Sequence, residues 1–201
     1  MVLTPSTMVQ LGSPAPDFNL KDVVSGRPIS LSAFSDKKAL LVMFICRHCP
    51  YVQHIKDELS RLDKTYRAKD IALIAISSND AENYPDDAPE SLKAFAIEQN
   101  WHFPFLYDAT QETAKKYTAA CTPDFFLYEN RVGANGRSPL LVYRGQLDDS
   151  RPGNGKPLDG KDLREAIDAV LGDKPLPKTQ KASIGCNIKW KKGNEPTYFK
   201  S

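Results

Sequence analysis

The chain has 201 residues, 41% of them hydrophobic and 26% charged, which is enough apolar material for one globular domain and too little length for two. A formal net charge of +2 gives no reason to expect nucleic acid or a membrane as a partner. Four cysteines are too few for a disulfide-stapled scaffold, and residues 1–10 lack the basic start and apolar stretch of a secretory signal. We therefore expect a soluble, cytoplasmic protein.

A small hairpin is the first predicted element. Residues 18–20 and 29–31 are strand-like and flank the turn-forming pair Ser25-Gly26. We treat residues 1–14, which precede this hairpin, as a separate N-terminal segment.

A βαβ unit is predicted next, with two of the cysteines at its first turn. Residues 39–45 are a continuous apolar run of strand length, typical of a strand buried on both faces, and residues 71–76 repeat the pattern. Between them, apolar residues recur at spacings of three and four and predict one buried face of an amphipathic helix: Val52, Ile55, Leu59, Leu62 and Tyr66. Cys46 and Cys49 lie between the first strand and this helix.

The rest of the chain is predicted to alternate between helices and strands. The elements are a helix after Asp87, which is placed to cap it, a strand at 103–107, a short helix at 108–119, two antiparallel strands at 125–128 and 140–143 joined by residues 129–139, and a helix capped by Asp159 and closed by Gly172. The order predicts an α/β domain over residues 15–172. Residues 173–201, with seven lysines against one Asp and one Glu, form a basic C-terminal extension.

The Cys46-Arg47-His48-Cys49 motif carries the predicted chemistry. A C-x-x-C motif can be a redox dithiol, a structural disulfide or half of a zinc site. Cys121 and Cys186 are isolated and do not supply a second close pair for zinc, and Pro50 stands where haem attachment would need His. The strand-to-helix junction therefore favours a redox dithiol, and we expect no metal and no cofactor.

The two cysteines are predicted to have different roles. Cys46 is expected at the positive end of the helix dipole, where the unpaired N–H groups favour its thiolate over its thiol. Arg47 and His48 would add positive charge. We predict that Cys46 is the nucleophile and that Cys49, about one helical turn further on, resolves the mixed disulfide.

These motifs resemble those of the thioredoxin-like superfamily, and within it the alkyl hydroperoxide reductase/thiol-specific antioxidant branch of peroxiredoxin-like proteins. The resemblance covers residues 15–172 and rests on residues 15–20 (Ala-Pro-Asp-Phe-Asn-Leu), on the strand leading into the cysteines and on residues 121–126 (Cys-Thr-Pro-Asp-Phe-Phe). Residues 183–190 also look like an extension of some peroxiredoxin-like proteins. The resemblance implies a thioredoxin-like fold, with a central mixed sheet flanked by helices.

The resemblance also implies further site residues. In the superfamily a Thr or Val precedes a cis-proline that faces the active cysteines, and Thr122-Pro123 matches that pair. Cys121 would then lie near the dithiol, and Cys186 would reach it if the extension folds back. A disulfide between Cys121 and Cys186, or a resolving role for Cys186, is a hypothesis.

The chain differs from the family patterns at two places, and these differences decide which function is the leading hypothesis. Ala39 and Met43 stand where typical peroxiredoxins carry Pro and Thr before the peroxide-reacting cysteine, and Ile45 stands where thioredoxins carry Trp. The leading hypothesis is a thiol–disulfide oxidoreductase that acts on protein or small-molecule disulfides and is recharged by an unidentified thiol reductant. The alternatives are a thiol-dependent peroxidase and a non-enzymatic binding module with structural or zinc-bound cysteines. His48 before the second cysteine suggests a less reducing potential than that of thioredoxin.

Overall fold

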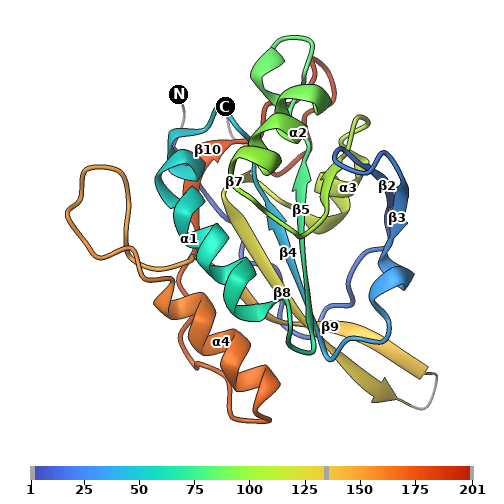
Figure 1. The fold of residues 1–201 in the computed structure, drawn as a ribbon, viewed down its shortest axis with the longest axis vertical. Coiled ribbons are helices and arrows are strands. Elements are labelled where there is room, and N and C mark those ends of the chain that lie inside the picture. Colours follow the sequence, from blue (N-terminus) through green and yellow to red (C-terminus); the bar gives the residue numbers. More distant parts are fainter. Residues whose placement is uncertain (1–2, 134–135, 200–201) are drawn as a thin grey trace.

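A seven-stranded mixed sheet forms the centre of the protein, in the order β3-β2-β6-β5-β4-β8-β9 (Figure 1). The structure is a computed structural model and describes residues 3–133 and 136–199. β4, β5 and β6 run parallel, and β8 pairs antiparallel with β4. The strands are β2 (Asn19–Asp22), β3 (Pro28–Ser30), β4 (Ala39–Phe44), β5 (Ile71–Ser77), β6 (Phe105–Tyr107), β8 (Asp124–Gly133) and β9 (Gly136–Gly145).

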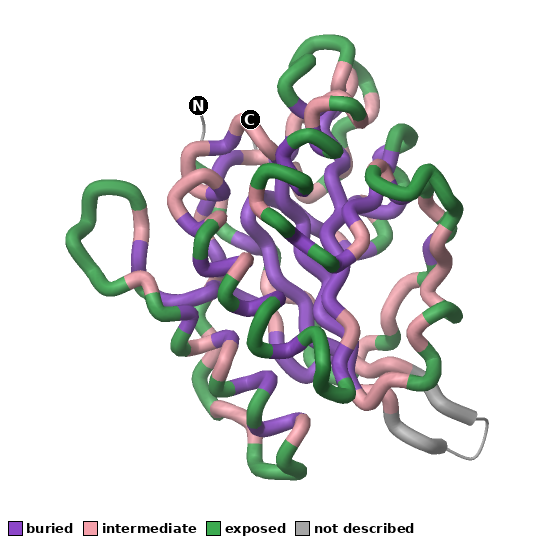
Figure 2. The backbone as a smooth tube through the Cα atoms, viewed as in Figure 1, coloured by how far each residue is buried: buried purple, intermediate pink, exposed green. Residues whose placement is uncertain are grey.

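Helices cover both faces of this sheet, and the alternation of side chains along β4 shows why. Leu41 and Met43 pack into one apolar cluster with residues of α1 and α4, whereas Leu40 and Val42 pack into a second cluster with α3. Every residue of β4 is buried as a result, and Figure 2 shows the buried strands between these layers. The helices are α1 (Pro50–Tyr66), α2 (Pro89–Glu98), α3 (Glu112–Tyr117) and α4 (Lys161–Leu171), with short 3-10 turns at Leu31–Phe34 and Pro85–Asp87.

The predicted hairpin and βαβ unit are confirmed, and the predicted buried face of α1 is correct at all five positions. The start of α1 differs from the prediction. The helix begins at Pro50, whose fixed backbone angle and missing N–H suit a first helical position, and Cys49 is the residue that caps it. Residues 45–48 form a loop, so Cys46 lies before the helix and not in its first turn.

The predicted cap at Asp87 is wrong, whereas the Asp159 carboxylate does accept a 3.0 Å hydrogen bond from the backbone N–H of Lys161, the first residue of α4. Ala88, not Asp87, precedes α2, and Gly160, not Asp159, precedes α4. The Asp87 carboxylate instead accepts hydrogen bonds from the loop that carries the cysteines. The sequence around α2 gives no sign of this contact. The connection between β8 and β9 is also shorter than predicted, because both strands extend into it, and residues 134–135 of it lie outside the described residues.

A second sheet of three strands joins the two ends of the described chain. β10 (Ile184–Asn187) lies between β1 (Leu3–Pro5) and β7 (Cys121–Thr122), antiparallel to both. In Figure 1 the red β10 runs beside the beginning of α1. The C-terminal extension therefore packs onto the domain, and its Cys186, Ile188 and Trp190 are buried. Within the described residues, no helix has the length and apolar character needed to span a bilayer.

Candidate active site

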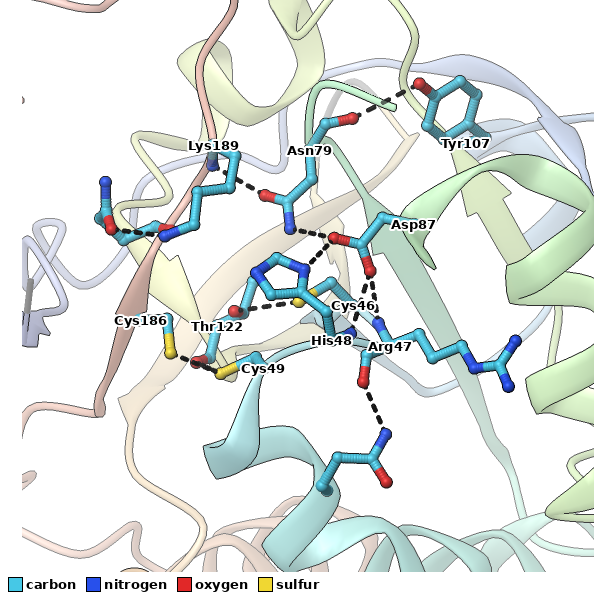
Figure 3. Close-up of polar contacts among 12 residues, drawn as sticks. Cys46, Arg47, His48, Cys49, Asn79, Asp87, Tyr107, Thr122, Cys186 and Lys189 are labelled. Carbon is cyan, nitrogen blue, oxygen red and sulfur yellow. Dashed lines mark hydrogen bonds and ion pairs between the residues drawn. The ribbon is translucent and has the colours of Figure 1, made fainter. Parts of the chain in front are cut away.

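Cys46 and Cys49 face the peptide that joins Thr122 to Pro123, which is cis as the resemblance implied (Figure 3). The Cys46 Sγ lies 3.4 Å from the Thr122 Oγ1, and the Cys49 Sγ lies 3.1 Å from the Thr122 carbonyl oxygen. Both contacts follow from the fold, because β4 delivers the cysteine loop beside the start of β8, its antiparallel neighbour. The structure thus brings together the two sequence motifs, which are 76 residues apart.

Asp87 holds the cysteine loop in place. Its Oδ1 accepts hydrogen bonds from the backbone N–H groups of Arg47, at 2.8 Å, and His48, at 3.2 Å. Its Oδ2 pairs with the Nδ1 of His48 and accepts a 2.7 Å hydrogen bond from the Asn79 side chain. The carboxylate is fully buried, so these four donors replace the water that it would otherwise need.

Of the two predicted positive charges, that of Arg47 turns away from the sulfurs and that of His48 is paired with Asp87. The guanidinium of Arg47 points to Ser91 and donates a hydrogen bond to its hydroxyl at 2.8 Å, so its positive charge lies away from the sulfurs. His48 pairs with Asp87 and stacks on the ring of Tyr84, 5.4 Å between centroids. The hydrogen bond to Asp87 raises the pKa of His48. Burial acts against ionisation of Asp87, but its hydrogen bonds to His48 and Asn79 hold the pKa of Asp87 below its usual value.

The two sulfurs therefore differ in the direction of their pKa shifts. Burial, the neighbouring Cys49 and the negative charge of Asp87 raise the pKa of Cys46 well above that of an ordinary thiol. Hydrogen bonds from Cys186 and Cys46 lower the pKa of Cys49, with a contribution from the backbone N–H of Val52 in the first turn of α1. The sequence predicted that the helix would start at Cys46, but its capping residue is Cys49, three residues later. The start of the helix therefore favours the thiolate of Cys49 and not that of Cys46.

Cys186 is the third sulfur of the site. Its Sγ lies 3.0 Å from the Cys49 Sγ, although the two residues are 137 positions apart. The hydrogen bond to Cys49 and burial raise the pKa of Cys186, so Cys49 is the more acidic of these two sulfurs. Cys46, Cys49 and Cys186 are each 2% exposed or less.

Cys121 is the fourth cysteine, and it lies close enough to interact electrostatically with Cys49 and Cys186. All four cysteines are free thiols in the structure, so the bond between Cys121 and Cys186 stays a hypothesis, and the sulfur in contact with Cys186 is that of Cys49. Cys186 is opposite Thr122 in the β7–β10 pair, and side chains alternate between faces, so Cys121 points away. Its Sγ lies 3.6 Å from the Pro123 carbonyl oxygen, and burial raises the pKa of Cys121.

Cys46, His48 and Asp87 could also be ligands of a metal ion, since a ligand atom from each lies within 4.8 Å of the other two. Structural zinc sites take four ligands, and only these three residues form such a group in the described part of the chain. Both oxygens of Asp87 already accept hydrogen bonds, and the raised pKa of Cys46 disfavours the thiolate that a metal requires. The arrangement fits a hydrogen-bond network better than a metal centre.

The site is covered. Beside Pro123 there is a cavity of about 10 Å³, lined by residues that include His54, Ser150 and Ser183, which is room for at most one water molecule. A substrate reaches the sulfurs only if a covering segment moves, and β10 is the strand that lies against them.

The sequence did not identify two residues of this site. Asp87 has the sequence context of a helix cap, and Asn79, which follows β5, links the Asp87 carboxylate to the backbone N–H of Lys189. A polar loop that follows a buried parallel strand, here β5, was the available signal, because the carboxyl ends of adjacent parallel strands share one edge of a sheet.

Comparisons with known proteins agree with this geometry. The model of the AhpC/TSA family matches residues 11–136. None of the curated proteins searched matches the chain. Among solved structures, an uncharacterized conserved protein from Geobacillus kaustophilus is 49% identical, with a TM-score of 0.89 over 95% of this chain and 97% of that one. A hypothetical protein from Sinorhizobium meliloti is 47% identical, with a TM-score of 0.89 over 94% and 100%.

A more distant structure identifies the fold. The thioredoxin domain of a thiol-disulfide oxidoreductase from Bacteroides vulgatus is 21% identical, with a TM-score of 0.51 over 68% of this chain and 91% of that domain. The predicted α/β, thioredoxin-like fold is thereby confirmed.

Proposed function

Because the chain belongs to the AhpC/TSA family and has a thioredoxin-like fold, we propose that it is a thiol–disulfide oxidoreductase whose reactive couple is Cys46 and Cys49. One observation carries the proposal: both sulfurs lie against the cis Thr122–Pro123 peptide, 3.4 Å and 3.1 Å from two oxygens of Thr122. The two sulfurs also share a hydrogen bond with each other, and such a dithiol can cycle between two thiols and one disulfide.

The pKa shifts support a definite order of events. The Cys49 thiolate attacks one sulfur of a substrate disulfide and releases the other half of the substrate as a thiolate. Cys46 then loses its proton and attacks the Cys49 Sγ, which releases the second half and leaves a Cys46–Cys49 disulfide. This order reverses the roles predicted from the sequence, because the pKa of Cys49 is lowered and that of Cys46 is raised. The reverse reaction would donate a disulfide.

His48 and Asp87 support the step in which Cys46 loses its proton. A ring nitrogen of His48 lies within 4.8 Å of the Cys46 sulfur, so the imidazolium that Asp87 favours would stabilise the Cys46 thiolate as it forms. Asp87 orients the ring through Nδ1 and fixes the loop through two backbone N–H groups. We assign Asp87 as a positioning residue.

Small-molecule disulfides are the substrates that the covered site favours, and an unidentified thiol reductant would recharge it. All three sulfurs are nearly inaccessible, so a bulky protein disulfide needs a larger displacement of β10 than a small one does. Oxidised glutathione is a suitable probe of this class.

Trapping tests the proposal and the order together. A Cys46→Ser, Cys186→Ser double variant, treated with oxidised glutathione, should hold glutathione as a mixed disulfide on Cys49, because no neighbouring thiol can resolve it. Cys49→Ser should hold much less on Cys46. Peptide mapping by mass spectrometry reads both. Efficient trapping on Cys46 instead would restore the order predicted from the sequence, and no trapping on either cysteine would refute the redox couple.

Peroxidase activity is the second candidate, favoured by the lowered pKa of Cys49 at a helix start. The Cys49 thiolate would take one oxygen from a hydroperoxide to form a sulfenic acid and an alcohol, and a neighbouring thiol would condense with it and release water. Hydroperoxide consumption with a thiol reductant, measured beside disulfide reduction, separates the two activities.

A further inference from the structure

β10 holds Cys186 firmly against Cys49. The strand is paired on one side with β1 and on the other with β7. Ser183 donates from its hydroxyl to the Pro123 carbonyl oxygen at 2.6 Å, and the backbone N–H of Ile188 donates to the Ala120 carbonyl oxygen at 3.1 Å. A Cβ at Gly185 would lie 2.0 Å from the Thr122 carbonyl oxygen, so the close approach of the strands needs glycine there.

The geometry of Cys49 and Cys186 suits a disulfide. Their 3.0 Å separation is about 1 Å longer than an S–S bond, so small rotations of the two side chains would close it. Both sulfurs are buried, and a hydrogen bond joins them. Cys49 therefore lies between two thiols, Cys46 and Cys186, that can each react with it.

We propose that Cys186 is a third redox-active cysteine, which takes the disulfide over from Cys46 so that the oxidised protein holds a Cys49–Cys186 bond and a free Cys46. This inference rests on the proposed function and adds the residue that completes its cycle. The Cys49–Cys186 disulfide would then link β10 covalently to the start of α1 and hold the extension over the cis-proline.

The proposed step is a balanced disulfide exchange. Cys186 loses its proton, and its thiolate attacks the Cys49 Sγ in the Cys46–Cys49 disulfide. The Cys49–Cys186 bond forms, the Cys46–Cys49 bond breaks, and Cys46 leaves as a thiolate that takes up the proton. When Cys49 carries a substrate in place of Cys46, the same attack releases the reduced substrate. The only oxidant consumed is the substrate disulfide.

Disulfide mapping of the full chain tests the proposal. The wild-type protein and the variants Cys46→Ser, Cys186→Ser and Cys121→Ser are oxidised with excess oxidised glutathione, the free thiols are alkylated, and the disulfides are located by mass spectrometry without reduction. We expect a Cys49–Cys186 bond in most wild-type molecules, with Cys46 and Cys121 alkylated. Cys46→Ser should form the same bond, and the matched control Cys121→Ser should behave as the wild type does.

The outcomes separate this proposal from the proposed function. If the wild type forms only Cys46–Cys49, and Cys46→Ser keeps glutathione on Cys49 with Cys186 alkylated, Cys186 is not a redox residue, although the Cys46–Cys49 couple stands. If neither bond forms in any of the four proteins, both proposals are wrong. The wild-type result does not depend on whether any variant folds.

Discussion

Cys46 and Cys49 are three residues apart and almost equally buried, yet they lie in opposite surroundings. On the side of Cys46, a buried carboxylate, Asp87, adds negative charge and favours the thiol. On the side of Cys49, the hydrogen bond with Cys186 and the start of α1 favour the thiolate. Burial raises the pKa of both sulfurs and is the largest cause at Cys46, whereas hydrogen bonds outweigh it at Cys49. The partners of each sulfur also affect its charge, and most of them come from distant parts of the chain.

The largest test of this comparison removes one sulfur at a time. Because Cys49 is the sulfur that both neighbours attack, Cys49→Ser should lower the rate of glutathione disulfide reduction by at least about 1000-fold. Cys46→Ser and Cys186→Ser should each cost much less, since the remaining thiol still resolves Cys49, and the double variant should be as inactive as Cys49→Ser. A steady-state assay with a thiol reductant measures this. Equal losses in Cys46→Ser and Cys49→Ser would end the distinction between the sulfurs.

The next test changes the Cys46 side. Asp87→Asn keeps the shape of the side chain and replaces its charged acceptor, so the backbone N–H groups of Arg47 and His48 lose their strong partner. We expect a loss of about 1–3 kcal/mol in the free energy of unfolding in urea, and a lower pKa for Cys46.

Asp86→Asn, at the exposed neighbouring residue, is the matched control and should change the free energy of unfolding little. If Asp87→Asn is as stable as this control, Asp87 does not hold the cysteine loop.

The reduction potential tests the Cys49 side. A stabilised Cys49 thiolate stabilises the reduced protein, which makes the protein a weaker reductant. We expect a potential at least about 30 mV above the roughly −270 mV of thioredoxin, equivalent to about 1.4 kcal/mol. Equilibration with glutathione buffers measures it. A potential as low as that of thioredoxin would mean that the Cys49 thiolate is not preferentially stabilised.

The smallest effect is the pH dependence that His48 brings. Because its pKa is raised in the folded protein, its ion pair with Asp87 stabilises the fold fully below the ordinary histidine pKa of about 6.5, and the stabilisation is lost as the pH rises through the raised value. The difference in unfolding free energy between the wild type and His48→Gln should therefore shrink as the pH rises above about 6.5. His102→Gln, at a half-exposed histidine, is the control. A difference that grows with pH would contradict the assignment.

The sequence predicted the parts of the fold whose cause is local. The spacing of the apolar residues in α1 and the apolar runs of β4 and β5 record which faces are buried, so those elements could be predicted. It also placed Cys46, Cys49, Thr122 and Pro123 together, although that grouping came from a family resemblance and not from the pattern of residues.

The parts that could not be predicted depend on contacts between distant residues. Asp87 has the sequence context of a helix cap, and only the packing of the turn against the cysteine loop gives its carboxylate stronger donors. The extension shows no periodicity, because β10 contributes few residues and is held by neighbours from elsewhere in the chain. The direction of the sulfur pKa shifts depends on both features.

Because β10 lies near the C-terminal end of the chain, the ribosome synthesises the two cysteines of the site well before the strand that covers them. The pairing of the sheet β1-β10-β7 connects Ser6 to Ser183, which are 177 residues apart, and β10 is synthesised 137 residues after Cys49. At about 5–20 residues per second, the dithiol of a growing chain stays without its covering strand for roughly 7–27 s. A nascent chain therefore carries an open pair of cysteines that the finished protein encloses. Deleting residues from 183 onward would recreate that open state permanently.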